Sequence, residues 1–421
     1  NPNQEPRTKN PNQEPEPLNP GTGTPEPRNP GTPEPPHDTT PLSMPPPSSD
    51  PPVQLRRELG KWDLTAIGVN QVIGGAVFAV PATLALYLGA WSWLAVGLVG
   101  LLAMAVALNF AEAGSRFEST GGPYIYTRAA FGRFVSFEVG WMGWVVRVTS
   151  WASVVNVLVN ALGYYWPDLT TGGLRTALIS TAVLGIMALN IRGIRHSSLV
   201  VNALTIGKLT PLVLFILIGL PHVSLGALRP ETTPTWEQIS TAALLLIFVF
   251  GGYEIIPVPA GEARDPRKAV PFAMITTIII VAIVMTLAQV VALGTLPGLA
   301  QSGSQTPLAD AALIMMGAWG ALLMTAGTSI SVAGNNVGAA LAGSRILFAL
   351  PEQGHVPRVF GHIHARFRTP DVAIVLTCLT TLALALSGSF VKLAAISAIR
   401  PCEYVSSSAL NVSSPLSFAS M

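Results

Sequence analysis

The sequence is poor in charged residues and in cysteine. Only 11% of its 421 residues are Asp, Glu, Lys or Arg, whereas soluble domains carry about a quarter. This depletion predicts that lipid, not water, surrounds most of the chain. The formal net charge of +2 gives no support for nucleic-acid binding. Cys378 and Cys402 are the only cysteines, too few for a disulfide framework or a metal-binding set.

Apolar residues are almost absent from the first 55 residues, which repeat NPNQEP and then NPGTPEP. Such a segment has too little apolar surface to offset the entropy lost on ordering. We therefore expect a disordered, Pro-rich cytoplasmic tail over 1–55, partly in the polyproline II conformation.

Long apolar runs begin at Leu64 and recur through the rest of the chain. Each is long enough to cross about 30 Å of hydrocarbon as a helix. The predicted spans are 64–88, 91–113, 134–164, 176–191, 198–220, 240–260, 270–296, 311–350 and 371–387. The eighth is too long for one straight crossing, so we expect it to continue as a cytoplasmic extension.

Basic residues are unevenly distributed between the loops on the two sides. If the N-terminus is inside, the outer loops hold only Arg175 and Arg229, and the inner segments hold many, among them Arg345. The positive-inside rule therefore predicts a multi-pass protein of the plasma (inner) membrane with a cytoplasmic N-terminus.

Two predicted spans are interrupted in the same way. VNQVIGGAVFAVP (Val69 to Pro81) and FGGYEIIPVPAGE (Phe250 to Glu262) each run apolar sequence into a Gly-Gly pair and then proline. Non-helical backbone is tolerated at membrane depth only where it lines a cavity or is buried in protein. Matching interruptions in two halves point to a secondary transporter's binding site. The alternative is that the glycines merely permit close helix packing.

The chemistry of the two interruptions suits a ligand that carries both signs of charge. A half-helix beginning near Gly75 would present free N–H groups and a positive dipole end to a carboxylate. Carbonyls freed around Phe250 and Gly251 would accept hydrogen bonds from an ammonium group. The predicted partners are an amino acid or amine and the lipid bilayer, with no cofactor.

Charged residues inside the apolar spans are functional-site hypotheses, because a charge in the membrane is costly. Glu254 is the deepest acid, and Arg147 and Lys208 lie within apolar sequence. His355, His362 and His364 have spacing that resembles a metal site, but no acidic or cysteine ligand set accompanies them. We interpret them as part of a solvated loop and predict no metal site.

Three stretches resemble the amino acid–polyamine–organocation (APC) superfamily of permeases. VIGGAVFAVP resembles its break in the first helix, and FVFGGYEIIPVPAGEARDPRKAVP its break in the sixth. GSRILFALPEQGHVPRVFGHIHARFRTPDVAI resembles its eighth helix and the following loop. The resemblance implies an all-α polytopic fold of two inverted five-helix repeats, with a permease domain over 56–399. It also implies a secondary transporter, not an enzyme, which moves amino acids or amines by alternating access with proton coupling or exchange.

The resemblance also assigns roles by position. Gly74, Gly75 and Ala76 match backbone donors to the substrate carboxylate, and Phe248 matches a gating aromatic residue. Asn335 could turn its amide into the site, although a helix–helix hydrogen bond is the alternative. The predicted substrate-binding residues are Ile73, Gly74, Gly75, Ala76, Arg147, Phe248, Phe250, Gly251, Gly252, Tyr253, Glu254 and Asn335.

Lys208 and Glu254 are the predicted coupling residues. Lys208 lies where proton-coupled or exchanging relatives place a lysine, and its ammonium resembles a stand-in for the sodium ion of cation-coupled relatives. Burial disfavours the charged form of a lysine, so Lys208 could exchange a proton as the cavity opens and closes. The alternative is a permanently charged lysine bonded to carbonyls of the broken helix.

Arg147 stands at a position that lines the cavity in relatives, where a smaller or uncharged residue is expected. We hypothesise that Arg147 and Glu254 approach across the cavity and neutralise each other until substrate arrives. The competing hypothesis is that Arg147 binds a second carboxylate on an acidic substrate.

The C-terminal sequence departs from the family. FVKLAAISAI, Phe390 to Ile399, begins like the tenth helix, but the polar RPCEYVSSSALNVSSPLSFASM follows. We expect the resemblance to stop at Arg400, which leaves an incomplete second repeat and an atypical polar tail over 400–421. A truncated, non-transporting membrane protein is therefore the alternative function. A channel is less favoured, because it requires a continuous polar pore.

Overall fold

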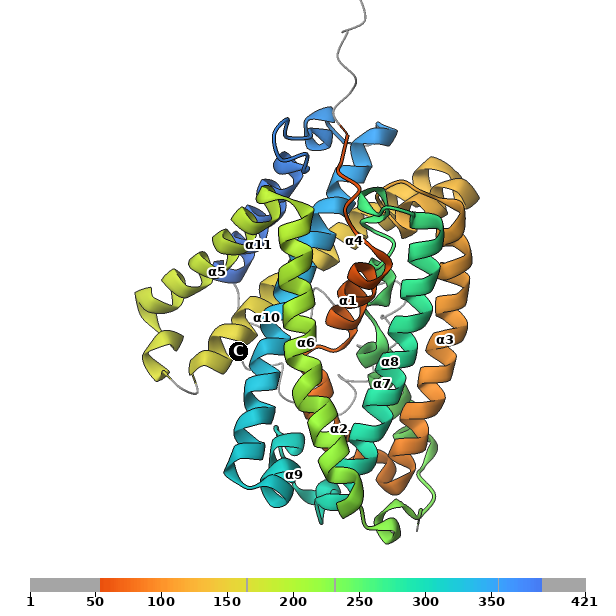
Figure 1. Ribbon diagram of the computed structural model, residues 1–421, viewed down its shortest axis with the longest axis vertical. Coiled ribbons are helices and arrows are strands. Elements are labelled where there is room, and N and C mark those ends of the chain that lie inside the picture. Colours follow the sequence, from red (N-terminus) through yellow and green to blue (C-terminus); the bar gives the residue numbers. More distant parts are fainter. Residues whose placement is uncertain (1–53, 164–165, 231, 355, 388–421) are drawn as a thin grey trace, which may run out of the picture. The chain divides into compact units, whose positions relative to one another are not determined.

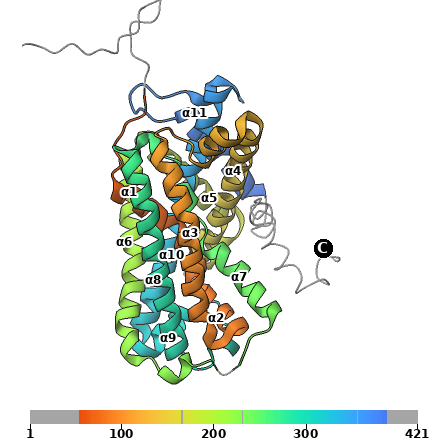
Figure 2. The same ribbon diagram turned by 90° about the vertical axis from the view of Figure 1, so that its right-hand side faces the viewer.

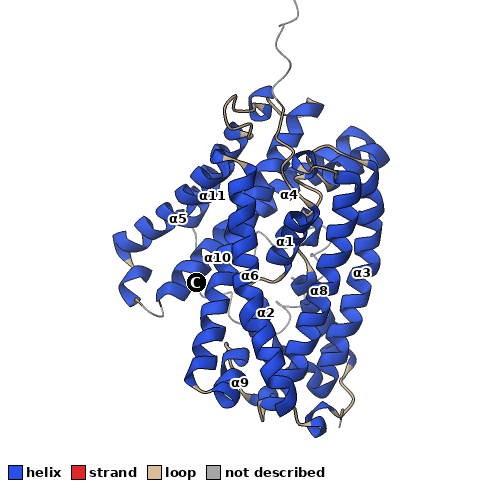
Figure 3. Cartoon of the chain, viewed as in Figure 1, coloured by secondary structure: helices blue, strands red, loops and turns tan. Residues whose placement is uncertain are grey.

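A computed structural model describes residues 54–163, 166–230, 232–354 and 356–387. All of them belong to one compact unit, Pro52–Met421. The described residues form helices joined by loops and contain no strand (Figure 3), as expected for an all-α fold. Most of the predicted N-terminal tail, the predicted tenth helix and the polar C-terminal tail lie outside the described residues.

Helices form in every predicted span. They are α1 (Lys61–Val72), α2 (Ala76–Leu88), α3 (Ser92–Arg116), α4 (Pro123–Gly163), α5 (Gly172–Arg192), α6 (Ile194–Gly219), α7 (Trp236–Phe250), α8 (Pro266–Thr295), α9 (Pro307–Met316), α10 (Ala318–Ala349) and α11 (Asp371–Ser387). Six described segments are long and apolar enough to cross a membrane. The chain is therefore a multi-pass membrane protein.

The predicted eighth span consists of two helices, α9 and α10. Gly317 separates them with φ 67° and ψ −161°, a backbone conformation that glycine adopts without a steric penalty. The sequence interpretation missed this break because apolar residues continue on both sides of it. From Asn336 to Ala349 every residue of α10 is buried, so this part of the helix has no lipid-facing surface, whereas Trp319 and Leu322 near its start are exposed.

Small residues bring α3 and α8 together. Both views show these helices side by side (Figures 1 and 2). A Cβ at Gly100 of α3 would lie 2.8 Å from the Cβ of Ala282, and one at Gly114 would lie 2.6 Å from Cγ1 of Val270. Both distances are shorter than a normal contact, so the approach of these helices depends on glycine, as is common in membrane proteins.

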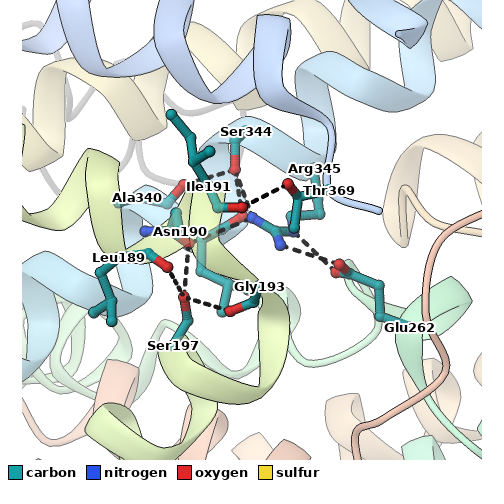
Figure 4. A network of polar contacts seen from close by, with 11 residues as sticks. Leu189, Asn190, Ile191, Gly193, Ser197, Glu262, Ala340, Ser344, Arg345 and Thr369 are labelled. Carbon is teal, nitrogen blue, oxygen red and sulfur yellow. Dashed lines mark hydrogen bonds and ion pairs between the residues drawn. The ribbon is translucent and has the colours of Figure 1, made fainter. Parts of the chain in front are cut away.

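A buried ion pair joins α10 to the segment that follows α7 (Figure 4). Arg345 Nε donates to Glu262 Oε2 at 2.9 Å, and Nη2 donates to Glu262 Oε1 at 3.0 Å. Both side chains are completely buried. Arg345 Nη1 also donates to Oδ1 of Asn190, at the end of α5, and to Oγ of Ser344.

The same glutamate holds the chain that enters α1. Its carbonyl accepts hydrogen bonds from the N–H groups of Glu58 and Leu59 at 2.9 and 3.0 Å. Glu262 therefore links α10, the end of α5 and the start of α1. Arg345 is one of the basic residues of the predicted inner segments, but its burial and its pairing with Glu262 could not be predicted from the sequence.

We expect Arg345→Met to destabilise the protein strongly, because it leaves the Glu262 carboxylate buried without its partner. Breaking such a pair costs about 3–5 kcal/mol, and adding Glu262→Gln should restore part of the loss. The measurement is the thermal unfolding midpoint in detergent. The control is Arg116→Met, in a pair whose side chains are 68% and 67% exposed, where about 0–1 kcal/mol is at stake. Equal midpoints for Arg345→Met and Arg116→Met would contradict the prediction.

Candidate functional site

The first interruption separates α1 from α2. Helix α1 ends at Val72 and α2 begins at Ala76, so the predicted half-helix starting near Gly75 is present. Gly74, Gly75 and Ala76 are partly accessible. The first N–H groups of α2 have no acceptor within their own helix, and they lie at its positive dipole end. This end of α2 therefore has the polarity that favours an anionic group, although the N–H groups of Gly74 and Phe78 donate to the carbonyls of Val72 and Gly75.

The second interruption follows α7. The helix ends at Phe250, and the chain continues through a left-handed Gly252 with φ 116° into the short 3-10 helix η5 (Tyr253–Ile255). No α-helix forms again until α8 begins at Pro266. The predicted span 240–260 is therefore α-helical only as far as Phe250. Pro257 and Pro259 lack the N–H group that a continuing helix requires.

The second interruption is in direct contact with the end of α1, next to the first interruption. A Cβ at Gly252 would lie 3.0 Å from both C and O of Gln71 and 3.2 Å from N of Val72. The backbone after α7 thus packs against the last turn of α1. A residue with a side chain would be crowded there, so the close packing of the second interruption against the end of α1 depends on Gly252.

Helix α10 forms a wall beside the first interruption. Asn70 Nδ2 donates to the carbonyl of Gly334 at 2.7 Å, and Gln71 Nε2 donates to that of Asn335 at 3.0 Å. Asn335 Nδ2 donates in turn to the carbonyl of Gln71 at 3.3 Å. The Asn335 amide therefore makes the helix–helix hydrogen bond given above as its alternative. It also lies next to the site, 3.4 Å from where a Cβ of Gly74 would be.

Lys208 of α6 lies behind the first interruption and is completely buried. Its Nζ donates to the carbonyls of Asn70, Ile73 and Ser331 at 3.0, 2.7 and 3.2 Å. Three carbonyls match the three N–H groups of an ammonium. Ser331 Oγ also donates to the Ile73 carbonyl, at 2.9 Å. The lysine thus supplies donors to backbone of α1, the interruption and α10.

Arg147 and Glu254 lie close together, as hypothesised. Arg147 Nη2 is 3.5 Å from Glu254 Oε1, and their side chains are 9% and 27% exposed. Glu254 Oε2 accepts a hydrogen bond from the N–H of Gly252 at 2.7 Å. Arg147 Nη1 donates to Gln71 Oε1 at 3.4 Å. The pair therefore bridges α4, the end of α1 and the second interruption.

The aromatic residues near the second interruption have different surroundings. The Phe250 side chain is buried against Gly100 of α3, which leaves its carbonyl as the group that can face a ligand. Phe248 is 52% exposed. The Tyr253 ring packs edge-on against Phe110, with 6.2 Å between centroids. Three further residues at the site, Asn70, Gln71 and Ser331, were not predicted from the sequence. They are uncharged polar residues within apolar helices, and their spacing does not distinguish them from others of the same kind.

Comparison with known proteins gives the family. The sequence model described as amino acid permease matches residues 59–418, and the chain therefore belongs to the amino acid permease family, a family of transporters and not of enzymes. The matched residues include some beyond Arg400, where we expected the resemblance to stop.

Named relatives cover most of the chain. It is 28% identical to the serine/threonine exchanger SteT of Bacillus subtilis, over 82% of this chain and 80% of that protein. It is 25% identical to the branched-chain amino acid permease BcaP of the same organism, over 76% and 72%. It is 30% identical to the arginine/ornithine antiporter of Pseudomonas aeruginosa, over 75% and 67%.

We expect Gly252→Ala to destabilise the protein and to weaken ligand binding. Alanine is strained at φ 116°, at a cost of about 1–3 kcal/mol, and its Cβ would collide with the Gln71 backbone. The measurement is the thermal unfolding midpoint, with and without added amino acids. Gly185→Ala in α5, where a Cβ would meet open space, is the control and should be neutral or stabilising. Similar behaviour of the two variants would show that the contact at Gly252 is unimportant.

Proposed function

We propose that this chain is a secondary transporter that moves an amino acid or a related amine across the membrane by alternating access. The observation that carries the proposal is the contact between two interrupted helices beside the buried Lys208. Backbone groups at helix ends provide both donors and acceptors at one place, which suits a zwitterion. Membership of the permease family and the names of the relatives support the same function.

The ligand is proposed to lie between the two interruptions. Its carboxylate accepts hydrogen bonds from backbone N–H groups of Gly75 and Ala76, and its ammonium donates to carbonyls at Phe250 and Gly251. The N–H of Gly74 donates to the carbonyl of Val72 at 2.9 Å, so it would have to exchange this bond for one to the ligand. Because each interruption belongs to a different half of the chain, one ligand holds both halves together. The corresponding fold is a pair of inverted five-helix repeats, with the N-terminus in the cytoplasm.

Lys208 is proposed to couple transport to protons or to exchange. As an ammonium it bonds α1, the interruption and α10 at once. A neutral amine has only two N–H groups, so loss of the proton would leave one carbonyl without its donor. The attachment of α1 to α10 would then weaken, as opening of the site requires.

The proposal is tested by counterflow of labelled amino acids into proteoliposomes that contain the full chain. Saturable exchange that depends on unlabelled amino acid inside supports a transporter. A linear, unsaturable leak would instead indicate a channel. The absence of any flux, for protein that remains folded, would indicate a non-transporting membrane protein and would reject the proposal.

We expect Lys208→Met to lower the exchange rate at least about tenfold, a loss that corresponds to about 1.4 kcal/mol. Methionine has a similar length but donates no hydrogen bond, so three buried carbonyls lose the hydrogen bond from Lys208, and only that of Ile73 keeps the one from Ser331 Oγ. The matched control is Lys268→Met, since this lysine is 88% exposed and should tolerate the change. Undiminished exchange by Lys208→Met would exclude the coupling role.

A further inference from the structure

We infer that Arg147 determines the charge class of the substrate. By neutralising Glu254, it makes the site select amino acids with uncharged side chains over cationic ones. The inference rests on the proposed function and names the substrate class of the same site.

The Arg147–Glu254 pair is positioned where it would contact the side chain of a bound substrate. Glu254 accepts the N–H of Gly252 at the second interruption, and Arg147 contacts Gln71 one residue before α1 ends. Gly252 contacts the backbone of Gln71, so the second interruption touches the last turn of α1, directly before the first interruption. A ligand bound to backbone groups at both interruptions therefore lies beside this ion pair.

Glu254 is the more accessible partner. Its side chain is 27% exposed, compared with 9% for Arg147. The Arg147 side chain passes close to α10, where a Cβ at Gly343 would lie 3.2 Å from its Cγ. Its guanidinium is held by Gln71 and Glu254. A ligand side chain thus meets the carboxylate first, and a ligand carboxylate could reach the guanidinium only by displacing these contacts.

The electrostatic consequence follows from the 3.5 Å separation. An isolated, partly buried carboxylate would attract a guanidinium or ammonium side chain, because Coulomb interactions are strong where water is scarce. Arg147 cancels this attraction and repels a second cation at the same place. Lys208 adds no attraction for cations, since it is itself positive and its donors point to backbone carbonyls. Exclusion by repulsion is a common route to specificity.

The test is counterflow of labelled serine, leucine, arginine and glutamate in proteoliposomes with the full chain and its variants. We expect the wild type to exchange serine and leucine in preference to the charged amino acids. Arg147→Met, which removes the charge but keeps an unbranched side chain, should raise the arginine-to-serine exchange ratio at least tenfold. The double variant Arg147→Met/Glu254→Gln should return the ratio to the wild-type value.

A second variant, at the other residue of the pair, keeps the inference testable if Arg147→Met does not fold. Glu254→Gln leaves the arginine without its carboxylate, and it should raise glutamate exchange relative to serine. The control is Arg175→Met, which removes an arginine bonded to Asn160 near the ends of α4 and α5, and should leave both ratios unchanged.

The outcomes separate the alternatives. A wild type that prefers arginine, or an arginine-to-serine ratio that is unchanged in Arg147→Met, would overturn the inference while leaving the proposed function intact. Loss confined to glutamate in Arg147→Met would show instead that Arg147 binds a second carboxylate. If the wild type exchanges none of the four, the proposed function fails. In that case, binding alone tests the role of Arg147. Added arginine must raise the thermal unfolding midpoint of Arg147→Met and not that of the wild type.

Discussion

The structure depends on how backbone polar groups are satisfied where a helix is interrupted inside an apolar bundle. An unpaired carbonyl in hydrocarbon costs several kcal/mol, so an interruption persists only if something replaces the missing bonds. Here Lys208 supplies donors to Asn70 and Ile73 on either side of the end of α1. Asn70, Gln71 and Ser331 provide further hydrogen bonds across to α10 or back from it. A charged residue is unusual in a membrane helix such as α6, but here the Lys208 ammonium satisfies the carbonyls at the interrupted end of α1.

The second interruption is supported in a different way. No lysine donor is seen there among the described contacts; the chain is instead fixed at two places along its path. Near its start, the Glu254 carboxylate accepts the N–H of Gly252. Near its end, Glu262 is held by Arg345. The irregular segment from Gly251 to Glu262 is therefore fastened by a partly accessible ion pair at one end and a fully buried one at the other. Only the first is open to competition from a ligand.

Much of this arrangement was predictable from the sequence, for identifiable reasons. Glycine pairs in apolar runs located both interruptions, because glycine is otherwise unfavourable within a helix; Pro81, by contrast, lies inside α2. Arg147, Lys208 and Glu254 stood out because charges are rare in such sequence, and the proximity of Arg147 and Glu254 was predicted correctly. The partners of these charges were not predictable. Asn70, Gln71 and Ser331 act through backbone carbonyls of other helices, and such contacts depend on helix rotation and packing. The break at Gly317 and the burial of Arg345 are likewise set by tertiary packing.

Helix α10 contacts both the first interruption and the irregular segment that follows α7. Ser331 bonds to Ile73 in the first interruption, Asn335 bonds to Gln71 at the end of α1, and Arg345 holds Glu262 at the end of the irregular segment that follows α7. With a rise of about 1.5 Å per residue, Ser331 and Arg345 are separated by about 21 Å along a rod that is buried over most of this length. A tilt of roughly 10° about the Ser331 end would move the guanidinium by roughly 4 Å, which is more than a hydrogen bond can stretch. If α10 tilts as one rigid rod, the contacts of the first interruption and the Arg345–Glu262 ion pair must therefore change together.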